Sequence, residues 1–179
     1  MMDIDAFRAA LCAPELIQLF DYWQALRGDR PMPRWSDIRP EQIAPVLPRI
    51  WAWRLVEGDA LHLRLVGEKI LEVMQRNVRG KAPEDLYPAA EAATIRARLL
   101  KVARLPACSY TIGDIFDGAE KVGTGERLAL PYSDAGDARG IIGASKAKLF
   151  PDSATGIEAP FNPKALYTLV GTEYYMTIV

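Results

Sequence analysis

Few side chains in this sequence of 179 residues have the types and spacing that carry chemistry. His62, the only histidine, could serve as a general base or as a haem ligand. It alternates with leucines in "ALHLRLVG" (60–67), so we expect it on the partly solvated side of a strand instead. Cys12 and Cys108 have neither a disulfide framework nor a metal-ligand spacing, and we interpret Cys108 as a buried, inert thiol. Because no nucleophile, base and orienting group can be combined, we predict that the protein is not an enzyme.

A second candidate is the stretch from Trp23 to Leu55, which is rich in arginine and proline and holds all four tryptophans. Basic and aromatic residues together are typical of nucleic-acid binding. The whole chain has 22 basic and 23 acidic side chains, however, so no global positive field attracts nucleic acid or an anionic membrane. We interpret the Arg27-Gly28-Asp29 triplet as a chance match to an adhesion motif. The stretch is therefore predicted to be a connector, with arginines at the surface or in ion pairs and tryptophans that close the core or an interface.

The start of the chain and its apolar runs bear on where the protein works. No apolar run approaches the roughly 20 residues that span a bilayer, and "MMDIDAFRAA" lacks the order of a signal peptide. We expect a cytoplasmic protein without a membrane partner. Apolar residues make up 50% of the chain, which is enough for one core of ordinary size and favours one domain.

The helices and strands that position these side chains are predicted from hydrophobic periodicity. Pro14 and Gly28 bound a first helix, whose apolar stripe includes Leu16, Phe20 and Trp23. Further helical segments are predicted over 40–47, in "EKILEVM" after Gly67, and over about 88–104. Strands are predicted over 49–56, 60–67, 107–116, 124–132 and 140–150, and the tail from residue 151 is expected to add a short helix and a strand.

This order of elements predicts an α+β fold, an antiparallel five-stranded sheet with helices on one face and an N-terminal flanking helix. It is the order of a PAS domain. The motifs "WxxLRG" (23–28), "MPRWSDIxP" (32–40), "LPRIW" (47–51), "LRLVG" (63–67) and "ERLALP" (126–131) resemble the bacterial PAS-like family common in alphaproteobacteria. The resemblance implies flanking helices and connector over 1–48, a PAS-like core over 49–150 and a packed C-terminal extension over 151–179.

The resemblance also implies a cavity between the sheet and the helices, in which PAS domains hold small ligands. The alternative for every apolar member is plain core packing. Arg96 and Arg127 would supply an anchor for an anion. The flavin-binding motif of some PAS domains is absent, and we expect no haem, flavin or metal cofactor. The predicted cavity residues are Leu63, Leu65, Ile70, Met74, Tyr87, Ile95, Arg96, Leu99, Tyr110 and Arg127.

Two functions are compatible with this resemblance. The first is a regulatory sensor that binds a small ligand or a signalling protein, and the second is a constitutive dimerisation or interaction module with a filled core. Many PAS domains dimerise through a helix before the first strand, so Leu16, Phe20 and Trp23 are predicted to form a homodimer interface. The alternative is that they cap the sheet.

Arg127 has an orientation that strand alternation makes ambiguous. In "GERLALP" it points opposite to Leu128, so if Leu128 and Leu130 face the helices, Arg127 faces away from them. A bulge near Gly125 could re-aim it. The sequence leaves three roles open for Arg127, namely a ligand anchor, a partner of a carboxylate side chain and a solvated surface residue.

Overall fold

The computed structural model describes residues 2–74, 78–117, 119–134, 139–150 and 167–178. The helices are α1 (Ile4–Ala10), α2 (Pro14–Arg27), α3 (Glu68–Met74), α4 (Pro83–Leu86), α5 (Ala89–Arg104) and the 3-10 helices η1 (Trp35–Asp37), η2 (Pro40–Ile43), η3 (Leu47–Arg49) and η4 (Glu57–Asp59). The strands are β1 (Ile50–Leu55), β2 (Leu61–Val66), β3 (Ala107–Asp117), β4 (Glu120–Ser133), β5 (Arg139–Leu149) and β6 (Tyr167–Thr177). The helices predicted from Pro14 to Gly28, after Gly67 and over about 88–104 are confirmed, as are the strands predicted within 49–150. The helix predicted over 40–47 is only the short 3-10 helix η2, and α1 is an element that the periodicity missed.

The strands form one antiparallel sheet in the order β2-β1-β5-β4-β3-β6. The predicted α+β fold is confirmed, but the sheet has six strands where five were expected. The extra strand, β6, comes from the C-terminal tail and pairs with β3 along its whole length. The helix expected earlier in the tail falls in 151–166, outside the described residues. The three expected domain boundaries stay a prediction.

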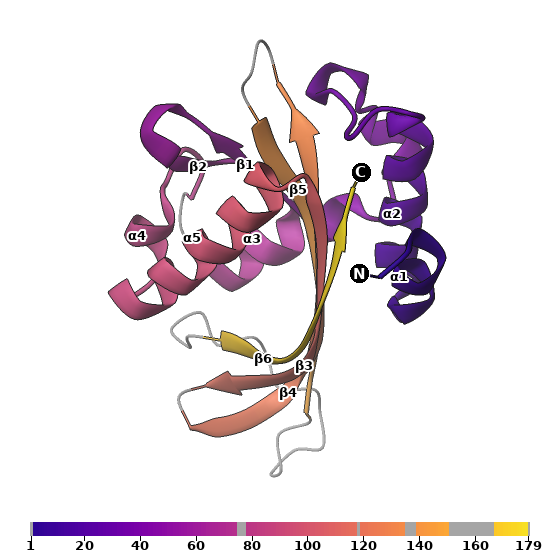
Figure 1. The fold of residues 1–179 in the computed structure, drawn as a ribbon. Helices are drawn as coiled ribbons and strands as arrows, with labels where there is room; N and C mark the ends of the chain where they lie inside the picture. The colour runs from indigo at the N-terminus through magenta and orange to yellow at the C-terminus, as the bar shows by residue number, and fades with distance from the viewer. Residues whose placement is uncertain (1, 75–77, 118, 135–138, 151–166, 179) are drawn as a thin grey trace.

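Helices cover both faces of the sheet, because the core helices lie on one face, as expected, and the N-terminal flanking helices cover the other. Figure 1 shows α1 and α2 on one side and α3, α4 and α5 on the other. We call these sides the α2 face and the α5 face. The apolar stripe of α2 needs a partner, and the sheet supplies it because its strands have apolar side chains on both faces.

The ends of α2 explain why this helix sits where it does. Pro14 occupies its first turn, and Gly28 ends it with a positive φ of 55°. The backbone N–H of Ala13 donates a hydrogen bond of 2.9 Å to the Glu126 carboxylate on β4. This bond satisfies an N–H group at the start of the helix and attaches the helix to the sheet.

A β-bulge in the first hairpin decides which side chains share a face. Ala52 pairs with Leu65, whereas the next residue, Trp53, pairs with Leu63, so Arg64 is an extra residue on β2. As a result Leu63 packs in the cluster on the α5 face and Leu65 packs against the cluster on the α2 face. The expectation that Leu63 and Leu65 line one cavity is therefore wrong.

Candidate functional site

The α2 face of the sheet is a closed apolar core. Tyr110, Leu128 and Leu130 from the sheet are fully buried. They pack in one cluster with Leu16, Phe20 and Trp23 of α2, which are 0%, 1% and 2% exposed. The predicted dimer stripe is thus corrected, because these side chains already cover the sheet within a single chain and have no free surface to offer.

The indole of Trp23 makes this packing directional. Its Nε1–H donates a buried hydrogen bond of 2.7 Å to the backbone carbonyl of Pro131 on β4. Phe7 and Phe20 extend the aromatic contacts, with ring centroids 5.3 Å apart. A core of this kind stabilises the fold and leaves no group for chemistry.

An apolar pocket of about 130 Å³ lies at the edge of the α2 face, where the connector meets the sheet. None of the residues that line this pocket is charged. Arg64 closes the neighbouring surface, since its guanidinium lies 4.1 Å from the centre of the Trp35 ring and 2.5 Å from the Asp134 carboxylate. The lining residues are Trp35, Ile38, Pro40, Ile43, Leu47, Ile50, Leu65 and Ile142.

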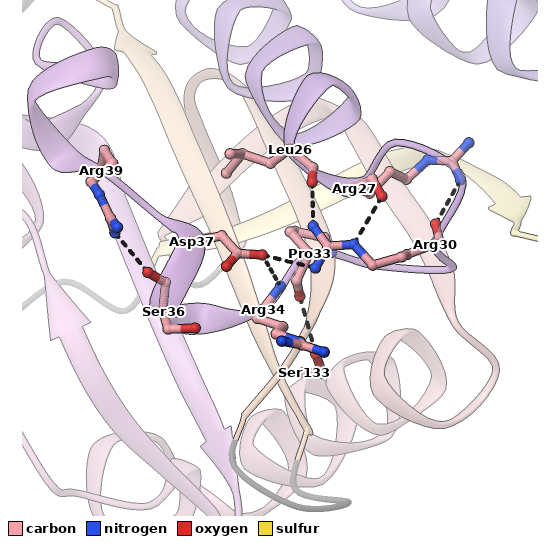
Figure 2. A network of polar contacts seen from close by, with 9 residues as sticks. All are labelled: Leu26, Arg27, Arg30, Pro33, Arg34, Ser36, Asp37, Arg39 and Ser133. Atoms are coloured by element: carbon pink, nitrogen blue, oxygen red, sulfur yellow. Dashed lines mark hydrogen bonds and ion pairs between the residues drawn. The ribbon is translucent and has the colours of Figure 1, made fainter.

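The basic connector is a structural element, as predicted. Figure 2 shows Arg30 turned back to the end of α2, where it donates to the backbone oxygens of Leu26 at 2.5 Å and Arg27 at 3.1 Å. Its guanidinium also forms an ion pair with Asp37 at 2.9 Å. A cation at the C-terminal carbonyls is favourable for a helix. Arg30 and Asp37 therefore hold the connector against the end of α2.

The α5 face differs because a row of polar side chains crosses it. The register pairs Glu173 of β6 with Thr111 of β3, Thr111 with Arg127 of β4, and Arg127 with Ser145 of β5. Directly paired residues in neighbouring strands point to the same side of a sheet. Ala129, two residues beyond Arg127, belongs to the cluster on the α5 face, so this polar row lies beneath α5.

Arg127 is the central cation of the polar row. Strand alternation is confirmed here, because Leu128 faces α2 and Arg127 faces the opposite way, where helices also lie. The Nε–H of Arg127 donates to Ser145 Oγ at 3.3 Å. Among the described residues, no carboxylate lies within 4.0 Å of its guanidinium and no other hydrogen bond satisfies it. Burial lowers the pKa of Arg127, with a smaller opposing effect from Tyr87.

Both acceptor positions of the Ser145 hydroxyl oxygen are occupied. Its Oγ accepts from Arg127 and also from the indole Nε1–H of Trp51, at 3.0 Å. A hydroxyl has two acceptor lone pairs and one donor. Its own O–H is therefore the group left to bond, and within the described part of the chain it has no acceptor.

The other end of the polar row is neutralised. Arg98 of α5 lies 2.5 Å from Glu173, and Tyr175 donates a hydrogen bond of 3.0 Å to the same carboxylate. Arg98 and Glu173 thus compensate each other across the gap between helix and sheet. Arg127 keeps its charge without such compensation.

A row of small residues borders the polar row. Gly171, Gly113 and Gly125 pair across β6, β3 and β4, and Ala147 continues the row on β5. A Cβ at Gly113 would collide with the backbone of Val170 on the neighbouring strand. The ends of β3, β4 and β6 near these glycines curve towards the side that holds α5 (Figure 1). The absence of side chains permits this curvature and leaves the bordering row without bulk.

The predicted cavity residues divide between the two faces. Arg96 is corrected to a structural role, because it forms an ion pair with Glu84 at 2.6 Å and donates to the Asp59 carbonyl at 2.7 Å. Tyr110 and Leu65 lie on the α2 face, and the side chain of Met74 is outside the described residues. The residues that the structure brings together on the α5 face are Leu63, Ile70, Tyr87, Ile95, Leu99 and Arg127.

Sequence reasoning missed the residues that surround Arg127. Ser145, Trp51 and Glu173 come from three other strands, and only the strand register places them beside Thr111 and Arg127. His62 lies exposed, with Nδ1 2.9 Å from the Gly80 carbonyl. Burial raises the pKa of the Cys108 thiol, which fits the inert role predicted for it.

The described residues contain neither a metal site nor a membrane-spanning helix. No group of three or more histidine, cysteine, aspartate or glutamate side chains has the geometry to hold a metal ion. Among the helices that the structure describes, none is long and apolar enough to cross a membrane.

Comparison with known proteins identifies one family. The family model described as PAS domain matches residues 12–145, which include α2, the connector and strands β1 to β4 with most of β5. No curated protein and no solved structure matches the chain.

Proposed function

We propose, from the premise that this chain belongs to the PAS domain family, that it is a regulatory sensor whose ligand binds on the α5 face of the sheet. PAS domains are generally sensory modules. The observation that carries the proposal is Arg127, a cation on the inner face of the sheet without a carboxylate partner among the described residues.

An unpaired arginine in a partly buried position is costly for a protein that has no use for it. Desolvating a charge without a partner destabilises the folded state, and structural cations are for that reason paired. The other face of the same sheet follows this rule, since Glu15 on α2 is paired with both Lys146 and Arg49. The exception at Arg127 supports a binding role.

The alternative is a constitutive interaction module with a filled core. The closed packing of the α2 face favours it, because the largest buried side chains gather there. A homodimer remains part of the proposal, although its surface is not the stripe of Leu16, Phe20 and Trp23.

Native mass spectrometry of the purified chain tests this function. We expect a species heavier than the 19.9 kDa chain by the mass of a small molecule, which denaturation releases. The same spectrum gives the oligomeric state. Spectra that contain only bare chain, whether monomer or dimer, would favour the constitutive module and contradict the sensor.

A further inference from the structure

We propose that the ligand of the α5 face is a small monocarboxylate with an apolar tail, whose two oxygens are bound by the Arg127 guanidinium and the Ser145 hydroxyl. This inference rests on the proposed function and gives it a ligand class. Three observations support it: the hydrogen-bond donors that Arg127 and Ser145 leave unused, the unpaired charge of Arg127 among the described residues, and the apolar side chains nearby.

The free groups of Arg127 and Ser145 are all donors. Arg127 uses its Nε–H on Ser145, and its two terminal nitrogens have no acceptor among the described residues. Ser145 accepts from Trp51 and from Arg127, so its O–H is left to donate. A ligand that satisfies these groups must bring acceptors only, which a carboxylate does and an amide or an amine does not.

The charges favour a single negative charge. Arg127 contributes one uncompensated cation, whereas Arg98 is already paired with Glu173 at 2.5 Å. A dianion would leave one charge unmatched in partly buried surroundings and near the carboxylate of Glu173. The planar guanidinium also matches the two coplanar oxygens of a carboxylate better than the tetrahedral arrangement of a phosphate dianion.

The side chains around the polar row favour an apolar tail. Ile70, Tyr87 and Ile95 pack at the edge of the cluster on the α5 face and are only partly buried. Tyr87 is close enough to Arg127 to influence its pKa. The row of glycines on the other side adds no bulk. A short aliphatic or aromatic group attached to the carboxylate would cover these partly exposed apolar surfaces.

The test uses the full chain and four monocarboxylates, namely acetate, butyrate, hexanoate and benzoate. Each is compared with the corresponding neutral amide as an uncharged control. Thermal melting is measured at constant ionic strength, with inorganic phosphate and phthalate as further arms. We expect at least one monocarboxylate with an apolar tail to raise the melting temperature in a saturable way, because it binds only the folded state. The amides, phosphate and phthalate should give less than a tenth of that shift.

Two substitutions of Arg127 and one control separate binding from folding. Arg127→Met keeps much of the volume and should abolish the carboxylate-dependent shift. Arg127→Lys keeps the charge but loses the planar fork, and should weaken binding about tenfold. Arg8→Met removes an exposed arginine that pairs with Asp21 on the other side of the sheet, and it should leave the shift unchanged.

The outcomes that overturn the inference are distinct from those that overturn the sensor function. Equal shifts with benzamide and benzoate, or an undiminished shift in Arg127→Met, would show a ligand that does not use the charge. A larger shift with phosphate than with any carboxylate would show a different anion. If no compound shifts the parent while native mass spectra hold a ligand, only the ligand class fails; if neither occurs, the sensor function fails as well.

Discussion

The two faces of the sheet are built from alternate residues of the same strands, yet they differ in whether their polar groups have hydrogen-bond and ion-pair partners. On the α2 face, Leu128 and Leu130 are fully buried beneath helices that close over them. On the α5 face, Arg127, which directly precedes Leu128 in the sequence, has one weak hydrogen bond and no ion pair among the described residues. Both faces hold a buried apolar cluster, but only the α5 face has this unpaired cation among the described residues, and the difference supports the proposal that the ligand binds there.

The largest expected effect concerns the closed face. Trp23→Ala removes a side chain that is 2% exposed together with its hydrogen bond to Pro131, so it should lower the free energy of unfolding by about 3–5 kcal/mol. Urea denaturation measures the change. Leu105→Ala, at a side chain that is 54% exposed, is the control and should change it by less than about 0.5 kcal/mol. If Trp23→Ala lowered the free energy of unfolding only slightly and converted a dimer to a monomer, the predicted dimer interface at Leu16, Phe20 and Trp23 would be supported after all.

A second effect tests the row of small residues on the α5 face. In Gly113→Ala the new Cβ meets the Val170 carbonyl of the neighbouring strand, and forced shifts of this kind cost about 1–3 kcal/mol. The change should appear as a lower urea midpoint. Thr172→Ala, at an exposed position on β6, should leave the midpoint nearly unchanged. An unaffected Gly113→Ala protein would show that the strands can separate there at no cost.

A smaller effect concerns the charges at the rim of the α2 face. The hydrogen bond from Lys146, with help from Arg49, lowers the pKa of Glu15. A lowered carboxyl pKa stabilises the fold at neutral pH, and this contribution is lost as pH falls through the lowered value. Lys146→Met should therefore cost about 0.2–1 kcal/mol at pH 7 and progressively less below about pH 4.

Urea denaturation of Lys146→Met at pH 7 and at pH 3 gives this comparison. Lys148→Met is the matched control, because the exposed Lys148 lies two residues along the same strand, on the same side of the sheet, and is not paired with Glu15. A loss that is the same at both pH values would mean that the Lys146 stem, and not its pairing with Glu15, carries the effect.

The smallest expected effect on stability is at Arg127. Because its charge is unpaired among the described residues, Arg127→Met should leave the free energy of unfolding unchanged or raise it by about 1 kcal/mol in the absence of ligand. The neighbouring substitution Leu128→Ala, on the closed face, should instead lower it by about 2–5 kcal/mol. A large destabilisation by Arg127→Met would identify the arginine as a structural partner and weaken the distinction between the faces.

Local patterns in the sequence predicted much of the fold but little of the site. Alternation placed Arg127 opposite to Leu128, and proline and glycine predicted both ends of α2. The hydrogen-bond partner Ser145 and the nearby Glu173 are placed by the register between strands far apart in the chain, for which no local signal exists.

Two expectations failed for a related reason. An apolar stripe shows that Leu16, Phe20 and Trp23 need a partner but does not show whether the partner is a sheet or a second chain. The alternation through Leu63 and Leu65 broke at Arg64, because a bulge inserts one residue without a distinctive sequence.

The indole N–H resonances of the four tryptophans test the central claim most directly, because the tryptophans are divided between the faces. Trp51 and Trp53 belong to the cluster on the α5 face, whereas Trp23 and Trp35 pack on the α2 face. In a nitrogen-15 NMR titration with the best-binding carboxylate, assigned with single Trp→Phe variants, the account predicts that the Trp51 signal moves and that of Trp23 stays. Movement of Trp23 and Trp35 with a stationary Trp51 would place the ligand on the closed face and contradict it.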